Sequence, residues 1–227
     1  YLLYAINKIG AIANMLVMNA TEAEIHEKLA VTESKVVITV DLALEKIVQA
    51  SRETSVKHII GVSLAESMPC VIGTLYKWKS KIKQENCILF SEFLKAGQGK
   101  KIDCQEIKAD APAVIAYTGR TTGKAKGVLL SNRAANTIAF QYKYADKVLD
   151  FQNGESFLDT IPPFLAYGLF LGVHMVLCVG LENILCPDPT AERFSQQFLK
   201  YKPNHLSGGA LHLSLIHISE PTRRRGI

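Results

Sequence analysis

The feature that most constrains the fold is a regular alternation of two sequence patterns. Short apolar runs are typical of strands, namely IGAIANMLV (9–17), KVVITV (35–40) and KHIIGVS (57–63). Stretches of helical period separate them, namely EAEIHEKLAVTES (22–34) and LALEKIVQAS (42–51). Parallel strands need a crossover long enough to hold a helix. The order therefore predicts an α/β fold of βαβ layers, with helices packed on mostly parallel sheets.

Two more strands are predicted on either side of a glycine-rich loop. APAVIAYT (111–118) ends directly in this loop, and GVLLS (127–131) leaves it. A helix is expected over residues 131–150, with Ser131 or Asn132 as its N-cap. No linker rich in Gly, Ser or Pro marks a domain boundary, and the length allows one large domain or two small ones.

Composition excludes several classes of function. The 227 residues are 48% hydrophobic, which is enough to bury a sizeable core. The net charge of +5 comes from basic residues scattered among nearly as many acids, so we expect no nucleic-acid partner. Five irregularly spaced cysteines fit neither a disulfide framework nor a zinc site and indicate reduced thiols in a cytoplasmic protein.

Residues 160–181 are free of Asp, Glu, Lys and Arg, and this run is long enough to cross a bilayer. Two prolines, three glycines and a histidine interrupt it, and it has no basic flank. We therefore expect a buried helix–strand pair and no membrane span.

Both ends of the chain look unusual. It opens with YLLYAINKIG, which has no signal-peptide pattern and is expected to start inside a fold. Residues 213–227, LSLIHISEPTRRRGI, resemble the translated reading of a transposase sequencing adapter. We therefore expect this tail to lie outside the native fold.

The loop AYTGRTTGKAKGV (116–128) concentrates three kinds of phosphate-binding group. Threonine hydroxyls donate hydrogen bonds, glycines let backbone N–H groups approach closely, and lysines neutralise charge. These groups belong to Thr118, Gly119, Thr121, Thr122, Gly123, Lys124 and Lys126. Neither a Walker loop nor a GxGxxG dinucleotide fingerprint fits the spacing. The loop is therefore predicted to hold a polyphosphate, the alternative being a plain surface hairpin.

Four segments resemble a known family. YTGRTTGKAKGV (117–128) is similar to the phosphate-loop signature Y-T-S/G-G-T-T-G-x-P-K-G-V of the adenylate-forming enzymes, which include the acyl-CoA synthetases. YAINKIGAIAN (4–14), IPPFLAYGLF (161–170) and YKPNHLSGGALHL (201–213) resemble further segments of these enzymes. The resemblance covers residues 1–212 and implies an incomplete large N-terminal domain.

The resemblance implies an AMP-forming acid–thiol ligase. Such an enzyme uses ATP and Mg²⁺ to convert a carboxylate to an acyl adenylate, and then forms a thioester with coenzyme A. Two alternatives stay open at this point: an adenylation domain that loads a carrier protein, and a non-catalytic fragment that only binds nucleotide.

The resemblance also assigns residues to these roles. The nucleotide-binding set is Thr118, Gly119, Arg120, Thr121, Thr122, Gly123, Lys124 and Lys126, with Thr121 also serving Mg²⁺. The acyl-substrate set is Phe164, Tyr167, Gly168, Gly208 and Gly209.

The chain departs from the family pattern at three positions and lacks later segments. Arg120 stands in place of glycine, where it would add a phosphate contact, Ala125 in place of proline and Leu165 in place of histidine. The family's Y-G-x-T-E segment, ribose-binding aspartate and C-terminal lysine do not follow His212. We therefore expect no catalytic residue in this chain, and no activity from it alone.

Overall fold

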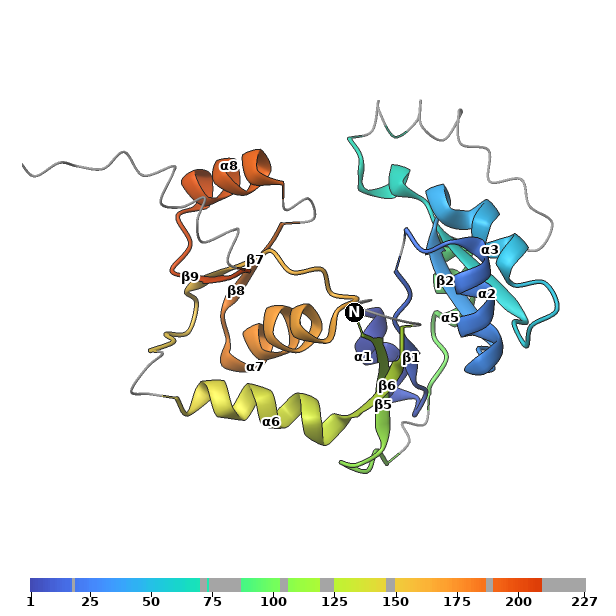
Figure 1. Cartoon of the computed structure of the whole chain (residues 1–227), viewed down its shortest axis with the longest axis horizontal. Coiled ribbons are helices and arrows are strands. Elements are labelled where there is room, and N and C mark those ends of the chain that lie inside the picture. The colour runs from blue at the N-terminus through green and yellow to red at the C-terminus, as the bar shows by residue number, and fades with distance from the viewer. Residues whose placement is uncertain are drawn as a thin grey trace, which may run out of the picture. The chain divides into compact units, whose positions relative to one another are not determined.

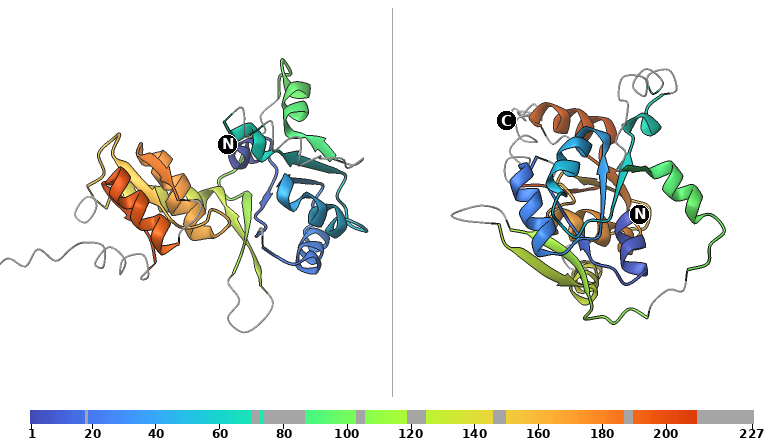
Figure 2. Two further views of the ribbon diagram at one scale, coloured as in Figure 1. Left: turned by 90° about the horizontal axis from the view of Figure 1, so that it is seen from above. Right: turned by 90° about the vertical axis from the view of Figure 1, so that its right-hand side faces the viewer.

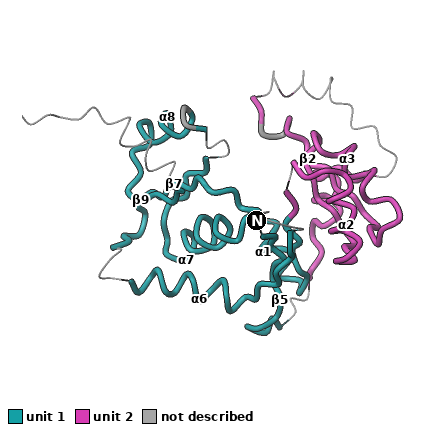
Figure 3. The backbone as a smooth tube through the Cα atoms, viewed as in Figure 1, with its two compact units in different colours: residues 1–15, 104–227 teal, residues 16–103 magenta. Residues whose placement is uncertain are grey.

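The computed structural model confirms the expected α/β architecture. It describes residues 1–17, 19–69, 73, 87–102, 106–118, 125–145, 150–186 and 190–209. The chain forms two compact units, one made of residues 1–15 and 104–227 and the other of residues 16–103 (Figure 3). In the described residues, the unit of residues 16–103 contains one three-stranded sheet, and the other unit contains two. Helices pack against these sheets (Figure 1).

The unit of residues 16–103 contains one parallel sheet in the order β2–β3–β4. Its strands are β2 (Val36–Val40), β3 (His58–Val62) and β4 (Cys87–Leu89). Its helices are α2 (Glu22–Val31), α3 (Leu44–Ala50) and α5 (Phe90–Gly97), with short 3₁₀ turns η1 (Asp41–Ala43) and η2 (Leu64–Ser67). Thr21 and Glu24 start α2 with a reciprocal capping box. Ile25 and Leu29, four residues apart, are both buried, as their spacing predicts.

The first sheet of the other unit carries the glycine-rich loop. Its elements are α1 (Leu2–Lys8), β1 (Ala13–Asn14), β5 (Pro112–Tyr117), β6 (Gly127–Ser131) and α6 (Asn132–Lys143). Strand β5 pairs in parallel with β1 and antiparallel with β6, so β5 and β6 form a hairpin (Figure 2). Ser131 is the N-cap of α6 because its hydroxyl accepts the N–H of Ala134 at 3.2 Å.

The strand expected over residues 9–17 is much shorter than predicted. Helix α1 runs to Lys8, and Gly10 turns the chain with a φ of +75°. Only Ala13 and Asn14 then pair with β5.

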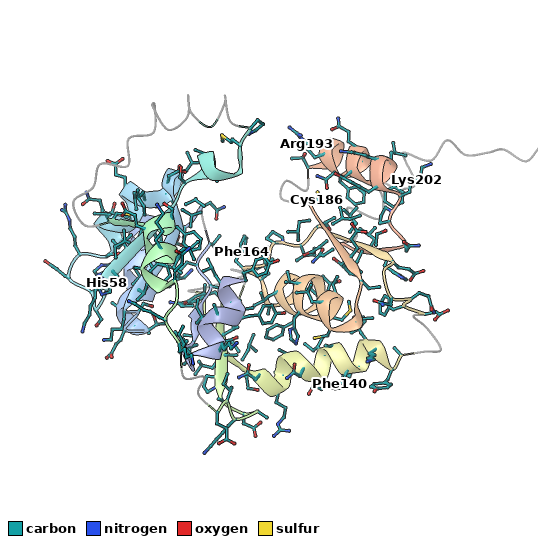
Figure 4. The ribbon with its side chains drawn as sticks, turned by 180° about the vertical axis from the view of Figure 1, so that it is seen from behind. His58, Phe140, Phe164, Cys186, Arg193 and Lys202 are labelled. Atoms are coloured by element: carbon teal, nitrogen blue, oxygen red, sulfur yellow. The ribbon has the colours of Figure 1, made fainter. Side chains whose placement is uncertain are left out.

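The second sheet of this unit is fully parallel, in the order β8–β7–β9. Its elements are β7 (Ser156–Asp159), the π-helix η3 (Gly168–Met175), α7 (Val176–Val179), β8 (Glu182–Leu185), α8 (Ala191–Tyr201) and β9 (His205–Ser207). Phe157 faces η3 and α7, whereas the next residue, Leu158, packs with Cys186 and with Phe194 of α8. Figure 4 shows Cys186 beneath α8. Helices thus cover both faces of this sheet, as predicted.

Residues 160–181 contain one helical segment and no strand, instead of the expected helix–strand pair. Strand β7 ends at Asp159, and a helical segment runs from Gly168 through Val179. Gly180, with a φ of +86°, ends this helix before β8 begins. Within the described part of the chain, no helix has the length and apolar character needed to cross a membrane.

Candidate functional site

The base of the glycine-rich loop is closed by two hydrogen bonds. The backbone N–H of Thr118 donates to the carbonyl oxygen of Lys126 at 3.0 Å. The backbone N–H of Lys126 donates in return to the Oγ1 of Thr118 at 3.1 Å. This second bond uses one lone pair of the Thr118 hydroxyl, so its proton stays available for an acceptor. These two bonds therefore hold the two strands of the hairpin together where the loop begins and ends.

Tyr117 anchors the hairpin to the neighbouring strand. Its hydroxyl donates to the Oδ1 of Asn14 on β1 at 3.0 Å, and burial raises the pKa of this phenol. The Cα of Gly127 lies beside the Tyr117 ring. A Cβ there would come within 3.2 Å of the Tyr117 ring and of the Ile115 side chain. Gly127 therefore lets the two strands close at the start of the loop.

The described ends of the loop fit an anionic ligand. They offer the Thr118 hydroxyl proton and the exposed Lys126 side chain, both of which suit phosphate oxygens. The described ranges contain no cluster of three or more His, Cys, Asp or Glu that would hold a metal ion. Six predicted nucleotide-binding residues lie outside the described residues, namely Gly119, Arg120, Thr121, Thr122, Gly123 and Lys124.

The predicted acyl-substrate residues come from two segments that the parallel sheet brings to one edge. Phe164 (Figure 4), Tyr167 and Gly168 follow the carboxyl end of β7, and Gly208 and Gly209 follow the carboxyl end of β9. Since β7 and β9 are parallel neighbours, both segments leave the sheet at the same edge. In open α/β sheets, ligands bind at this edge.

The substrate segment and the loop-bearing strand share a core. Leu169 and Phe170, directly after Gly168, pack in one apolar cluster with Val114 and Ala116 of β5. This packing fixes the start of η3 against the hairpin's first strand.

Tyr167 and Gly168 contribute in different ways. Tyr167 has 49% of its surface exposed, and its pKa is raised by burial and then by Tyr142 and Asp159. Gly168 is buried, and a Cβ there would lie 2.5 Å from the carbonyl oxygen of Ile161. Glycine is therefore required for η3 to begin so close to residues 161 and 162.

The sequence predicts structural roles for His174, inside an apolar run, and for His205. Both have hydrogen-bond partners that fit such roles. His174 accepts the Tyr4 hydroxyl at Nδ1 (2.9 Å) and donates from Nε2 to the Oδ1 of Asn136 (3.1 Å), while burial lowers its pKa. His205 bonds through Nε2 to the carboxylate of Glu155 at 2.7 Å. Each histidine thus has at least one ring nitrogen engaged in a hydrogen bond within the protein.

The sequence places Cys178 and Cys186 among apolar residues, which predicts that both thiols are packed. Cys186 is buried, as predicted, but Cys178 is exposed. The prediction for Cys178 was wrong because the apolar run that holds it forms a helix with one outward face, where its neighbour Leu177 is also exposed.

Two residues of the site were missed in the sequence. Asn14 ends the segment 4–14 that resembles the family, but no role was assigned to it, and its side chain accepts the Tyr117 hydroxyl. Asp159 ends an apolar strand and is buried at the substrate edge, with 3% of its surface exposed. An acid directly after SFL, at the end of a predicted strand, was the only sequence signal for it.

The hairpin, whose described ends suit an anionic ligand, and the parallel sheet define an α/β protein of the kind that binds ligands at the carboxyl ends of its strands. A sequence model described as AMP-binding enzyme matches residues 1–214, so the chain belongs to the AMP-binding enzyme family.

Individual relatives agree with this family. The chain is 28% identical over 210 residues to the long-chain-fatty-acid–CoA ligase of Bacillus subtilis, an alignment that covers 88% of this chain and 37% of that protein. It is 34% identical over 103 residues to a chloroplastic long-chain-fatty-acid–[acyl-carrier-protein] ligase of Arabidopsis thaliana, covering 45% of this chain and 13% of that one. The chain thus spans little more than a third of the length of the Bacillus relative and less of the Arabidopsis one.

Solved structures show the same fold. An anthranilate CoA ligase in complex with anthranoyl-AMP superposes with a TM-score of 0.77 at 17% identity, covering 94% of this chain and 38% of that one. At this identity the likeness establishes the fold alone, and it confirms the predicted fold class.

Proposed function

We propose that this chain is part of an AMP-forming acid–thiol ligase. In the first half reaction a carboxylate oxygen attacks the α-phosphorus of ATP, and pyrophosphate leaves to give an acyl adenylate. In the second, a thiol attacks the acyl carbon and AMP leaves, giving a thioester. The observation that carries the proposal is the hairpin closed by Thr118 and Lys126 in a chain of the AMP-binding family.

The hairpin would meet the main physical obstacle, which is charge. An anionic carboxylate has to approach a polyanionic nucleotide, so preorganised donors must offset the repulsion. Thr118 and Lys126 stand at the two ends of the loop and would contact the β- and γ-phosphates. We assign the same role to the intervening residues Gly119, Arg120, Thr121, Thr122, Gly123 and Lys124. Mg²⁺ would enter with the nucleotide and contact Thr121, and it would screen the phosphate charge.

The substrate edge would receive the acid. Phe164, Tyr167 and Gly168 stand after β7, and Gly208 and Gly209 stand after β9, so the two segments can contact an acyl group from two sides. The name of the Bacillus relative favours a long-chain fatty acid. The rate would come from positioning and charge stabilisation, with no covalent enzyme nucleophile.

Coenzyme A is the acceptor that we propose. The Arabidopsis relative named as an acyl-carrier-protein ligase favours a carrier-protein thiol as the second candidate. The two are separated by supplying hexadecanoate and MgATP with either coenzyme A or holo acyl carrier protein, and following AMP and the thioester by mass spectrometry. The parent polypeptide that contains this chain should form hexadecanoyl-CoA; formation of the carrier-protein thioester alone would favour the second candidate.

The boundaries and location of the protein are part of the same proposal. We propose that residues 1–212 form part of an adenylate-forming N-terminal domain in a cytoplasmic enzyme, and that residues 213–227 derive from a sequencing adapter. The end of the family match at residue 214 supports this division.

The 227-residue chain alone should not complete the reaction. It spans about a third of the length of its relatives, and groups that act as a unit lose most of the rate when some are removed. Hexadecanoate-dependent exchange of pyrophosphate into ATP should therefore stay at background with this chain. Exchange clearly above background would refute this expectation.

A further inference from the structure

The proposed function leaves one buried acid without a role. Asp159 ends the central strand β7, and only 3% of its surface is exposed. Its Oδ1 accepts the backbone N–H of Ile161 at 3.1 Å and the hydroxyl of Ser207 at 3.3 Å. Among the described residues no cationic side chain pairs with it, and burial raises its pKa. An acid in such a place is costly, since an apolar residue would need no hydrogen-bond partners.

The bonds of Asp159 join the two segments of the substrate edge. Ile161 begins the segment that leads to Tyr167 and Gly168, whereas Ser207 directly precedes Gly208 and Gly209. A parallel link reinforces the junction, because the buried hydroxyl of Thr160 donates to the carbonyl oxygen of Ser207 at 2.6 Å. The carboxylate thus fixes where both segments leave the sheet.

The same carboxylate also fixes the helix that follows. The Cα of Gly172, in the middle of η3, lies against Asp159, and a Cβ at Gly172 would overlap the carboxylate carbon and both of its oxygens. The Gly172 carbonyl oxygen also accepts the Nδ2 of Asn183 on β8 at 2.7 Å. A π-helix is uncommon and is often found at functional sites. Asp159 and Asn183, on neighbouring strands of one sheet, therefore both contact this helix at Gly172.

We propose that Asp159 is a positioning residue for the acyl part of the site. It holds residues 161–168 and residues 207–209 together at the substrate edge, so that Tyr167, Gly168 and Gly208 keep one arrangement. This role rests on the function proposed above. Asp159 is not assigned to phosphate binding, because its bonds lie on β7 and β9 and not on the hairpin.

The test compares two ligands on the full 227-residue chain by calorimetry. One is hexadecanoyl-sulfamoyl-adenosine, a stable analogue of a long-chain acyl adenylate, and the other is MgATP. Asp159→Ala should lower the affinity for the analogue by about tenfold or more, as expected for loss of hydrogen bonds to a charged group. It should change MgATP affinity by less than about twofold, because the hairpin is untouched.

Two further variants separate positioning from charge. Asp159→Asn keeps an oxygen at Oδ1, so it should retain analogue affinity within about threefold. Asp41→Asn is the matched control, because Asp41 also accepts a serine hydroxyl (Ser63, 3.4 Å) and a backbone N–H (Leu64, 3.2 Å) after a parallel strand, but in the other unit. It should leave both affinities unchanged.

Hydrogen exchange provides a readout that does not depend on ligand. The Ile161 amide bonds to the side chain of Asp159, whereas the Cys186 amide bonds to its main-chain oxygen at 2.9 Å. Asp159→Ala should speed exchange at Ile161 and leave Cys186 protected, which also shows that the sheet is intact. Asp159→Asn should restore protection at Ile161.

The outcomes distinguish the positioning role from the proposed function on which it rests. If Asp159→Ala lowers the affinities for the analogue and for MgATP equally, or leaves the affinity for the analogue unchanged, the positioning role is overturned and the proposed function stays in place. Failure of the wild-type chain to bind either ligand would instead remove the proposed function, and the positioning role with it.

Discussion

Gly168→Ala is the substitution whose effect follows most directly from the structure. A Cβ at this buried position would lie 2.5 Å from the carbonyl oxygen of Ile161 and would also overlap that of Pro162. Both clashing atoms belong to the backbone, so a change of side-chain rotamer cannot relieve the clash. Overpacking of this kind costs about 3 kcal/mol at the upper end of its usual range. The better helix propensity of alanine offsets about 1 kcal/mol.

The net loss for Gly168→Ala is therefore about 2 kcal/mol, which corresponds to a fall in Tm of about 4–8 °C for a chain of this size. Thermal unfolding followed by circular dichroism measures it. Gly97→Ala is the matched control, because Gly97 ends α5 and a Cβ there meets nothing within 4 Å. That variant should be neutral or slightly stabilised. A Gly168→Ala chain as stable as the wild type would show that the close approach at residues 161 and 162 does not exist.

Three further predictions concern stability. Ser131→Ala removes the side-chain cap of α6 and should cost about 1 kcal/mol in urea unfolding, whereas Ser131→Asn should restore most of it. Met175→Ala empties a fully buried position and should cost about 2–5 kcal/mol by the same measurement; a smaller loss would mean that Met175 is not packed. Burial raises the pKa of Asp159 in the folded state above its unfolded value of about 4. As the pH rises from below about 4 through this raised pKa, the wild type should therefore lose stability relative to Asp159→Asn. Tyr167, which faces this carboxylate, ionises well above that range. Unfolding midpoints at pH 4 and pH 7 that shift equally for both proteins would contradict the last prediction.

The parts of the fold that depend on local sequence were predictable. The strands on both sides of the loop, the cap at Ser131 and the buried pair Ile25 and Leu29 follow from residue type and spacing, and the structure confirms them. Such features arise within a few residues of chain, so a single sequence carries them.

The parts that depend on distant contacts were not predictable. Burial of Asp159 results from the pairing of β7 with β9 and the packing of η3, which bring residues 172 and 207 onto one carboxylate. The Asn14 contact to Tyr117 likewise spans 103 positions of chain. The helix over 168–179 was mistaken in part for a strand because an apolar run has no periodicity that tells the two apart.

The candidate site divides in the same way. The loop chemistry was readable because hydroxyls, glycines and lysines stand together in sequence, and the structure adds that Thr118 and Lys126 close its base. The acyl-substrate residues were named by resemblance only. The parallel pairing of β7 and β9 is what places their two segments at one edge of the sheet.

The central claim is that the hairpin binds the phosphates of a nucleotide. The most direct measurement is a calorimetric titration of MgATP into the wild-type chain and into Lys126→Ala, Thr121→Ala and the control Lys100→Ala, an exposed lysine outside the loop. The account predicts binding to the wild type and the control, with affinity about tenfold lower or worse in the two loop variants. Absence of binding to the wild type, or equal affinity in all four proteins, would contradict it.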